Sequence, residues 1–197
     1  MAFKLSYPKI CLIVFIIVFI FGAINPISRK DWLLESILSV LLVIILTLTY
    51  NKFKFSNTSY TLITIFLLIH TIGSHYTYSN VPFLNFLWTL TNSTRNHYDR
   101  IVHFLFGFLL YYPIRELIVR KTNIKGFLSY FLPFCVVASF SVLYEIIEWG
   151  AASIVSPELG AEYLGIQGDI WDAQKDSLLA IMGAISSIIL TLFKKKS

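Results

Sequence analysis

Six apolar runs limit the fold of this chain more than any other feature. Three of the segments between them are short, and two are about 20 to 25 residues long. A run of about 17–25 apolar residues is long enough to cross a bilayer as a helix. The chain is 56% hydrophobic and 14% charged, whereas a soluble domain carries roughly 25% charged residues. We therefore predict an all-α integral membrane bundle that forms a single multi-pass domain over residues 1–197. Its six transmembrane helices are expected at about 10–24, 32–50, 59–73, 98–119, 127–149 and 172–193.

The charged residues divide unequally between the two ends of such a bundle. With both termini in the cytoplasm, 11 of the 16 basic residues fall on the cytoplasmic side, with Glu116 as the only acid there. The positive-inside rule favours this orientation. We expect membrane lipids as partners, and the net charge of +5 is not taken to indicate a nucleic acid. The cytoplasmic basic residues would be Lys4, Lys9, Lys52, Lys54, Arg115, Arg120, Lys121, Lys125, Lys194, Lys195 and Lys196.

His and carboxylate side chains converge at the other, extracytoplasmic end. Glu145 lies 20 residues beyond Lys125, about 30 Å along a helix, which is the thickness of the hydrocarbon core. Ionisable groups at this depth are expected to pair with one another or to belong to a functional site. Four of the six predicted spans contribute to this layer, through His70, Asp99, His103, Glu145, Glu148, Asp172 and Asp176.

The last span begins in an acidic stretch, Gly168 to Asp176. Asp172 and Asp176 share the helix face that continues through small residues such as Ala180 and Gly183. Small residues let a helix pack closely against a neighbour in lipid, so these two acids should face the rest of the protein. Asp169, one turn further out, is expected only to cap the helix.

Clustered carboxylates with imidazoles are the ligand set of a divalent metal such as Zn²⁺ or Mn²⁺. Like charges so close together repel unless a cation, a shared proton or a basic side chain neutralises them. The leading hypothesis is a metal site that supports hydrolysis or group transfer on a lipid or lipid-linked envelope substrate. Its expected metal ligands are His70, His103, Glu145 and Asp172; its catalytic carboxylates Glu145, Glu148, Asp172 and Asp176; and its substrate-binding residues Arg100, Lys175 and Asp99.

Two alternatives remain open at this point. In the first, the protein is not an enzyme, and Arg95, Arg100 and Lys175 neutralise the acids in a structural ion-pair network. In the second, the acids and histidines serve ion- or proton-coupled transport. Whether the protein is an enzyme, what it binds and how it assembles are not determined by these residues.

Other features have simpler interpretations. The runs at 10–24 and 32–50 are expected to form a scaffold without buried charge. The apolar patch at 81–90 is too short to span and favours an interfacial or re-entrant helix. Four tryptophans are expected to form an aromatic belt at the outer membrane edge: Trp32, Trp88, Trp149 and Trp171.

Four motifs together resemble the YjdF-like family of bacterial inner-membrane proteins. They occur in order as His70-x-x-Gly73-x-His75-Tyr76, Tyr98-Asp99-Arg100-x-x-His103-Phe104, Tyr144-Glu145-x-x-Glu148-Trp149 and Gly168-Asp169-x-x-Asp172-Ala173-Gln174-Lys175-Asp176. This resemblance implies a helical fold in the inner membrane and supplies no activity.

A looser similarity extends to the VanZ-like membrane proteins. Those proteins show Asp-Lys-x-x-His at the entry to one helix, Glu-x-x-Gln at the end of the next and Asp-x-x-x-Asn at the start of the last. The matching positions here are Asp99, Arg100 and His103, then Glu145 and Glu148, then Asp172 and Asp176. The present chain has Glu148 in place of the Gln and Asp176 in place of the Asn. Because two amides become acids, the charge to be neutralised rises, and a cation site is favoured.

Overall fold

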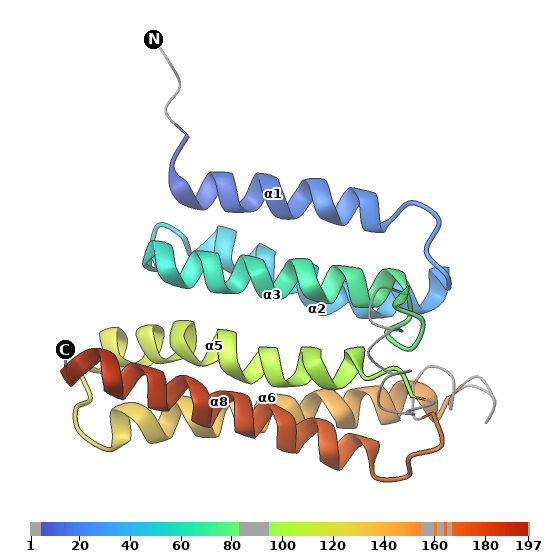
Figure 1. Cartoon of the computed structure of the whole chain (residues 1–197). Coiled ribbons are helices and arrows are strands. Elements are labelled where there is room, and N and C mark those ends of the chain that lie inside the picture. Colours follow the sequence, from blue (N-terminus) through green and yellow to red (C-terminus); the bar gives the residue numbers. More distant parts are fainter. Residues whose placement is uncertain (1–4, 83–94, 155–159, 161–163, 165–166, 197) are drawn as a thin grey trace.

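The computed structural model describes residues 5–82, 95–154, 160, 164 and 167–196. Within these residues the chain forms six helices and no strand, so the all-α prediction is confirmed for the described part. The helices are α1 (Tyr7–Gly22), α2 (Arg29–Thr49), α3 (Asn57–His75), α5 (Tyr98–Thr122), α6 (Leu128–Ala152) and α8 (Asp172–Lys196) (Figure 1). Four of them, α2, α5, α6 and α8, are long and apolar enough to cross a membrane, and α1 is a shorter apolar helix.

Local chemistry determines where the helices begin and end. The Ser28 hydroxyl accepts a hydrogen bond from the Asp31 backbone N–H, which starts α2 before the predicted residue Trp32. Ser56 caps α3 in the same way, as expected of serine at an N-cap. Asn123 ends α5 in the left-handed region, with φ of 58°, a conformation that asparagine tolerates. Caps therefore lengthen several helices beyond their apolar runs.

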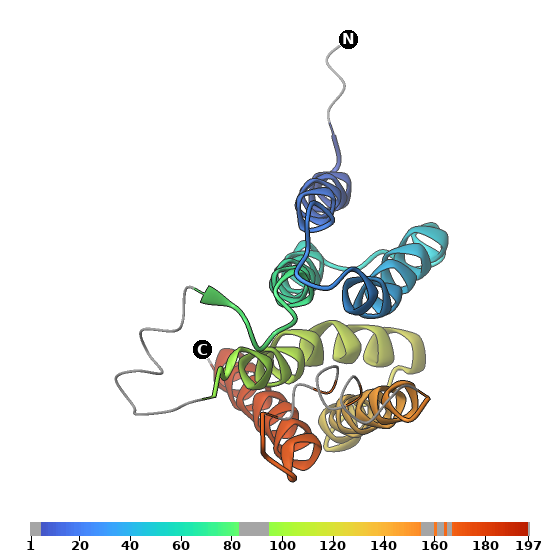
Figure 2. The same ribbon diagram turned by 90° about the vertical axis from the view of Figure 1, so that its right-hand side faces the viewer.

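Successive helices run in opposite directions, which brings the two ends of the chain to the same end of the bundle (Figure 1). Viewed along the helices, α1, α2 and α3 lie on one side of α5, and α6 and α8 lie on the other (Figure 2). Helix α5 contacts α3, α6 and α8, while α1 and α2 pack on α3. The first turns of α2, α5 and α8 lie at the opposite end (Figure 1), where the predicted polar residues lie.

The α5–α8 pair packs closely because both helices carry small residues at the crossing. A Cβ atom added to Gly107 would lie 1.8 Å from the Ala180 carbonyl oxygen, and one added to Gly183 would lie 2.0 Å from the Phe104 carbonyl oxygen. Ala180 is fully buried. The predicted packing face of the last helix is therefore confirmed, and this crossing sets how closely the acids of α8 approach α5.

The expected aromatic belt is only partly present. Trp149 and Trp171 are 65% and 59% exposed, as a belt requires, but Trp32 is only 8% exposed. Trp32 instead lies against Phe19, with ring centroids 5.4 Å apart, beneath the Arg29 guanidinium. The belt assignment is wrong for Trp32 because the first turn of α2 faces α1. Trp88 and residues 83–90 of the predicted interfacial helix lie outside the described residues.

Candidate functional site

Polar side chains from every described helix except α1 meet at one end of the bundle. The described set contains seven acids and three Lys or Arg residues, with two histidines and two tyrosines among them. We call this set the polar layer. Its members are Glu35, His70, Tyr78, Arg95, Asp99, Arg100, His103, Tyr144, Glu145, Glu148, Asp169, Asp172, Lys175 and Asp176.

Two acids of the polar layer are neutralised by basic side chains, and we call them the clamped acids, Asp169 and Asp172. The Arg95 Nη2 donates to Asp172 Oδ2 at 2.5 Å. The Arg100 Nη2 donates to Asp169 Oδ2 at 2.5 Å and to Asp172 Oδ1 at 3.2 Å. Lys175 Nζ completes the cluster, 2.6 Å from Asp169 Oδ2. Arg100 and Lys175, expected to bind substrate, are therefore occupied by these carboxylates.

The turn before α8 explains the geometry of Asp169. Its Oδ1 accepts the Trp171 backbone N–H at 3.1 Å, and its carbonyl oxygen accepts the Asp172 backbone N–H at 3.2 Å. The Lys175 ammonium, which donates to the carboxylate, holds the pKa of Asp169 well below its usual value, with further help from Trp171 and Arg100. Asp169 precedes α8, and its carboxylate bonds to the turn before the helix and to two basic side chains, so a role as a cap for α8 stays a prediction.

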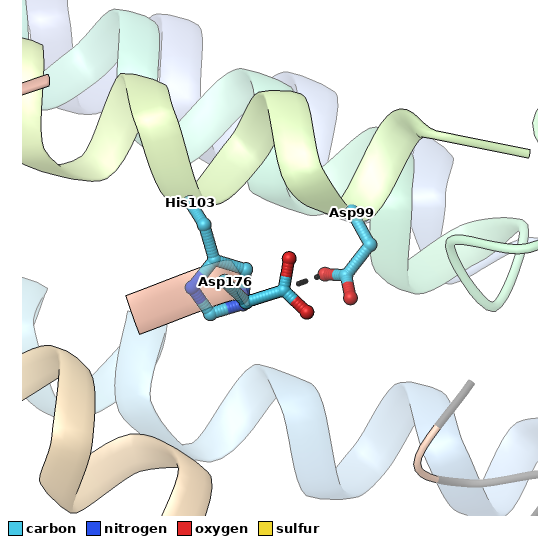
Figure 3. Close-up of side chains that lie close together, drawn as sticks. All are labelled: Asp99, His103 and Asp176. Carbon is cyan, nitrogen blue, oxygen red and sulfur yellow. Dashed lines mark ion pairs between the residues drawn. The ribbon is translucent and has the colours of Figure 1, made fainter. Parts of the chain in front are cut away.

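Three further side chains form what we call the open triad: Asp99, His103 and Asp176. Asp99 and His103 project from α5, one helical turn apart, toward Asp176 on α8 (Figure 3). One ligand atom of each residue lies within 4.8 Å of the other two, a spacing that could hold a metal ion. His103 and Asp176 are buried. The close α5–α8 crossing brings this triad together.

Glu145 of α6 lies beside the open triad. Its Oε1 is 3.4 Å from His103 Nε2, and Asp99 Oδ1 is 3.6 Å from the same nitrogen. Neither Glu145 Oε1 nor Asp176 Oδ1 has a hydrogen-bond partner among the described residues, although both atoms are buried. No Lys or Arg of the described part forms an ion pair with Asp99, Glu145 or Asp176. Buried polar atoms are normally paired, and among the described residues this region has only His103 as a potential positive partner.

A second buried cluster surrounds Glu35 of α2, which is only 7% exposed. Its Oε2 accepts from the Tyr144 hydroxyl at 2.7 Å and lies 3.4 Å from the Tyr78 hydroxyl. The expectation that the run at 32–50 carries no buried charge is therefore wrong. The missed signal is the stripe of Trp32, Glu35, Ser36 and Ser39, which lies at helical spacing and is buried as one face.

His70 belongs to this second cluster. Its Nε2 lies 3.1 Å from the Glu35 carbonyl oxygen, which can only accept, so Nε2 carries the proton in the neutral ring. Its Nδ1 then accepts from the Tyr78 hydroxyl at 2.5 Å. Burial, together with the charges of Glu35 and Asp99, raises the pKa of Tyr78 well above its usual value, so this hydroxyl keeps its proton. Both nitrogens of His70 are engaged by the protein.

The expected site residues thus separate into groups. Of the expected metal ligands, His103 and Glu145 are neighbours at the open triad, Asp172 is clamped, and His70 lies with Glu35. Asp99, expected to bind substrate, and Asp176, expected to be catalytic, complete the triad. Glu148, also expected to be catalytic, is half-buried and interacts electrostatically with Glu35, Asp99 and Glu145.

The helical architecture and apolar surface define an integral, multi-pass membrane protein with an acidic layer at one end. The family comparison agrees: residues 7–197 match the family described as "Predicted membrane protein (DUF2238)". The chain is 32% identical over 174 residues to the inner membrane protein YjdF of Escherichia coli (strain K12), covering 88% of this chain and 83% of that protein. The chain therefore belongs to this YjdF-like family, and its location is the inner membrane. No solved structure matches it.

Proposed function

We propose that the protein spans the inner membrane six times, with both termini in the cytoplasm, and binds a divalent cation at the open triad on the extracytoplasmic side. The observation that carries this proposal is the spacing of Asp99, His103 and Asp176, whose ligand atoms lie within 4.8 Å of one another. The orientation rests on the basic residues at the end of the bundle that holds the termini. The similarity to VanZ-like proteins stays a prediction.

The triad is close enough to form a cation site after side-chain adjustment. Zn²⁺ ligands at 2.0–2.2 Å in a tetrahedral site lie about 3.4 Å from one another. The ligand atoms of the triad lie within 4.8 Å of one another, so they would have to approach by up to about 1.4 Å, which rotation of the side chains can supply. Glu145, 3.4 Å from the His103 ring, is the natural fourth ligand or a general base.

Charge supports a cation over a purely structural role for the triad. Removing an acid from water is costly unless a partner compensates it. The clamped acids have Arg95, Arg100 and Lys175 as partners. Among the described residues, the ion pairs of Asp99 and Glu145 involve only His103, which is positive only when protonated. A divalent ion would supply the missing positive charge and would use the lone pairs of Asp176 Oδ1 and Glu145 Oε1, which have no hydrogen-bond partner in the described part of the chain.

A cation at this depth would act on groups near the membrane surface. We therefore extend the proposal to a lipid or lipid-linked envelope substrate, with the cation polarising an ester or phosphoryl oxygen. Glu145 and Glu148 would accept the proton of an attacking water. The arginines of the clamp would contribute indirectly, by fixing the first turn of α8 and thereby Asp176.

The second candidate is a non-enzymatic protein whose polar layer only holds the helices together. The bonds of Arg95 and Arg100 to Asp172 favour it, because they join the start of α5 to the start of α8. This alternative accounts for Asp169 and Asp172. It gives no role to Glu145 Oε1 and Asp176 Oδ1, which form no hydrogen bond with the residues that the structure describes.

Metal analysis of the detergent-purified protein separates the two candidates. The proposal predicts close to one bound Zn or Mn per chain, lost in Asp176→Asn and in His103→Ala while the helical content is unchanged. The matched control is Asp169→Asn, which alters a clamped acid on the same side of the bundle and should retain the metal. Wild-type protein without metal, even after incubation with Zn²⁺ or Mn²⁺ at pH 7, would contradict the proposal and favour the structural role.

A further inference from the structure

An apolar groove lies between α1, α2 and α3, at the end of the bundle opposite the polar layer. Its volume is about 210 Å³, smaller than the roughly 300–1,000 Å³ of pockets that take drug-sized ligands. Its floor is formed by Ile63 and Leu67 of α3, and its walls include Leu12 and Phe15 of α1 and Leu46 of α2. The groove is long and apolar enough for part of one hydrocarbon chain.

The groove opens between two helices whose outer faces are apolar and exposed. Ile13 and Ile16 of α1 are 41% and 43% exposed, and Ile44 and Ile45 of α2 are each 47% exposed. In a membrane protein such faces contact lipid chains. Helices α1 and α2 both pack on α3 (Figure 2), so the space between them is reached from the bilayer.

One end of the groove is polar and positively charged. Lys9 lines it, and the Lys54 ammonium lies 5.2 Å from the centre of the Tyr50 ring, which also lines it. Glu116, an acid at the same end, is already bonded to Ser56, Ser59 and Arg120. The free charge at this end is therefore positive, which selects an anionic group.

Tyr60 supplies a hydrogen-bonding group at the same end. It lines the groove and is 8% exposed. The Phe55 backbone lies close enough to interact with its hydroxyl, but no hydrogen bond of good geometry joins this buried oxygen to a described residue. A buried hydroxyl without a partner is unfavourable. An ester or phosphate oxygen at the head of a lipid chain would accept its proton.

We propose that this groove binds one anionic phospholipid, with an acyl chain along Leu12, Phe15, Leu46 and Leu67 and the headgroup at Lys9 and Tyr60. Tyr60 and Leu67 are seven residues apart on α3, so the groove offers the acyl chain a length of about 10 Å at 1.5 Å per residue. The lipid would belong to the leaflet at the basic end, which is the cytoplasmic leaflet in the proposed orientation. The site is independent of the cation at the open triad.

Native mass spectrometry of the purified full-length protein with added phosphatidylglycerol or phosphatidylcholine tests this proposal. Wild-type protein should retain one phosphatidylglycerol and prefer it over phosphatidylcholine about fivefold or more. Lys9→Gln should weaken phosphatidylglycerol binding about fivefold, the value of one basic residue near an anionic lipid surface. Lys125→Gln, an exposed lysine at the same end on the other half of the bundle, should not.

Filling the groove gives a second test. Leu46→Trp places a large ring in the groove and should abolish retention of the lipid, whereas Leu48→Trp, at a site 75% exposed on the same helix, should not. Equal retention of the two lipids by wild type, or equal retention of phosphatidylglycerol by the two tryptophan variants, would overturn the proposal.

Cys11 provides a readout that needs no groove substitution. It lines the groove, and the other free cysteine, Cys135, lies in α6. In Cys135→Ser, phosphatidylglycerol should slow maleimide labelling of Cys11 at least fivefold more than phosphatidylcholine does. Labelling of Cys135 in Cys11→Ser should respond equally to both lipids. Equal protection of Cys11 by both lipids would refute an anionic-lipid site even if Leu46→Trp fails to fold.

Discussion

Glu116, at one end of the bundle, and the acids of the open triad and Glu145, at the other, differ in how their oxygens are bonded. At the end that holds the termini, Glu116 Oε1 accepts from the Ser56 backbone N–H at 2.8 Å and from Arg120 Nη1 at 2.5 Å. Its Oε2 accepts from the Ser56 and Ser59 hydroxyls. At the other end, Asp176 Oδ1 and Glu145 Oε1 are buried without a hydrogen-bond partner among the described residues. Both oxygens of Glu116 are hydrogen-bonded, whereas Asp176 and Glu145 each have one oxygen without a hydrogen bond to a described residue.

This difference separates a structural acid from a functional one. The bonds of Glu116 join the start of α3 to the last turns of α5, so its carboxylate stabilises the packing of two helices. The acids of the open triad repel one another and lower the stability of the fold unless a positive partner is bound. Unpaired acids at one end, beside paired ones such as Asp172, therefore indicate a site for a cation.

The largest effect is expected from separating the helices that assemble the open triad. Gly183→Leu would place a side chain against the Phe104 carbonyl oxygen, only 2.0 Å from the added Cβ. Overpacking of this kind typically costs about 1–3 kcal/mol of stability, occasionally more. Because the clash here is with the backbone, the expected cost is at or above the upper end of this range. Thermal unfolding should show a large loss, together with loss of bound metal. Gly150→Ala, where an added Cβ meets nothing within 4 Å, is the control and should change neither.

Removing the bonded acid should have the next largest effect. Glu116→Gln loses the charge-assisted bond of Arg120 and leaves the buried serine donors poorly matched, which should cost about 2–3 kcal/mol. The loss should appear in thermal unfolding with and without metal, since the triad is at the other end. A variant as stable as wild type would show that bonding does not distinguish the two ends.

Removing an unpaired acid should act in the opposite direction. Without metal, Asp176→Asn relieves the repulsion from Asp99 and should leave the free energy of unfolding unchanged or raise it by about 1 kcal/mol, the interaction of two unit charges about 4 Å apart in water. The measurement is thermal unfolding in the presence of a chelator. Destabilisation comparable to that of Glu116→Gln would mean that Asp176 is a structural acid after all.

The smallest effect should come from the exposed part of the clamp. Because the folded pKa of Asp169 lies below its usual value, its contribution to stability is present above about pH 4 and is lost as the pH falls through the folded pKa. Thermal unfolding from pH 5 to pH 3 should therefore show a slightly steeper loss for wild type than for Asp169→Asn. Parallel profiles would contradict the clamp at Asp169. Lys175→Gln, which removes the main partner, should behave like Asp169→Asn.

Helix positions and the small-residue face of the last helix follow from the sequence, because apolar runs and Ala180 and Gly183 report directly on burial and close approach. The grouping within the polar layer does not. The position of His70 at the outer end of its span made it an expected metal ligand, whereas its two nitrogens contact the Glu35 carbonyl oxygen and the Tyr78 hydroxyl. Which acid meets which arginine depends on how the turn at Asp169 folds. The pairing of acids with arginines therefore depends on tertiary contacts, which the sequence pattern does not contain. The stripe of residues around Glu35, by contrast, lies at helical spacing in the sequence and could have been recognised there.

The most direct test is the shift in melting temperature that a divalent cation produces in three proteins: wild type, Asp176→Asn and Glu116→Gln. At a metal concentration 100 times the dissociation constant, binding to the folded state adds about 2.7 kcal/mol. We predict that Zn²⁺ or Mn²⁺ raises the melting temperature of wild type and of the less stable Glu116→Gln equally, and leaves Asp176→Asn unchanged. A shift of the same size in Asp176→Asn, or none in wild type, would contradict a cation site at the open triad.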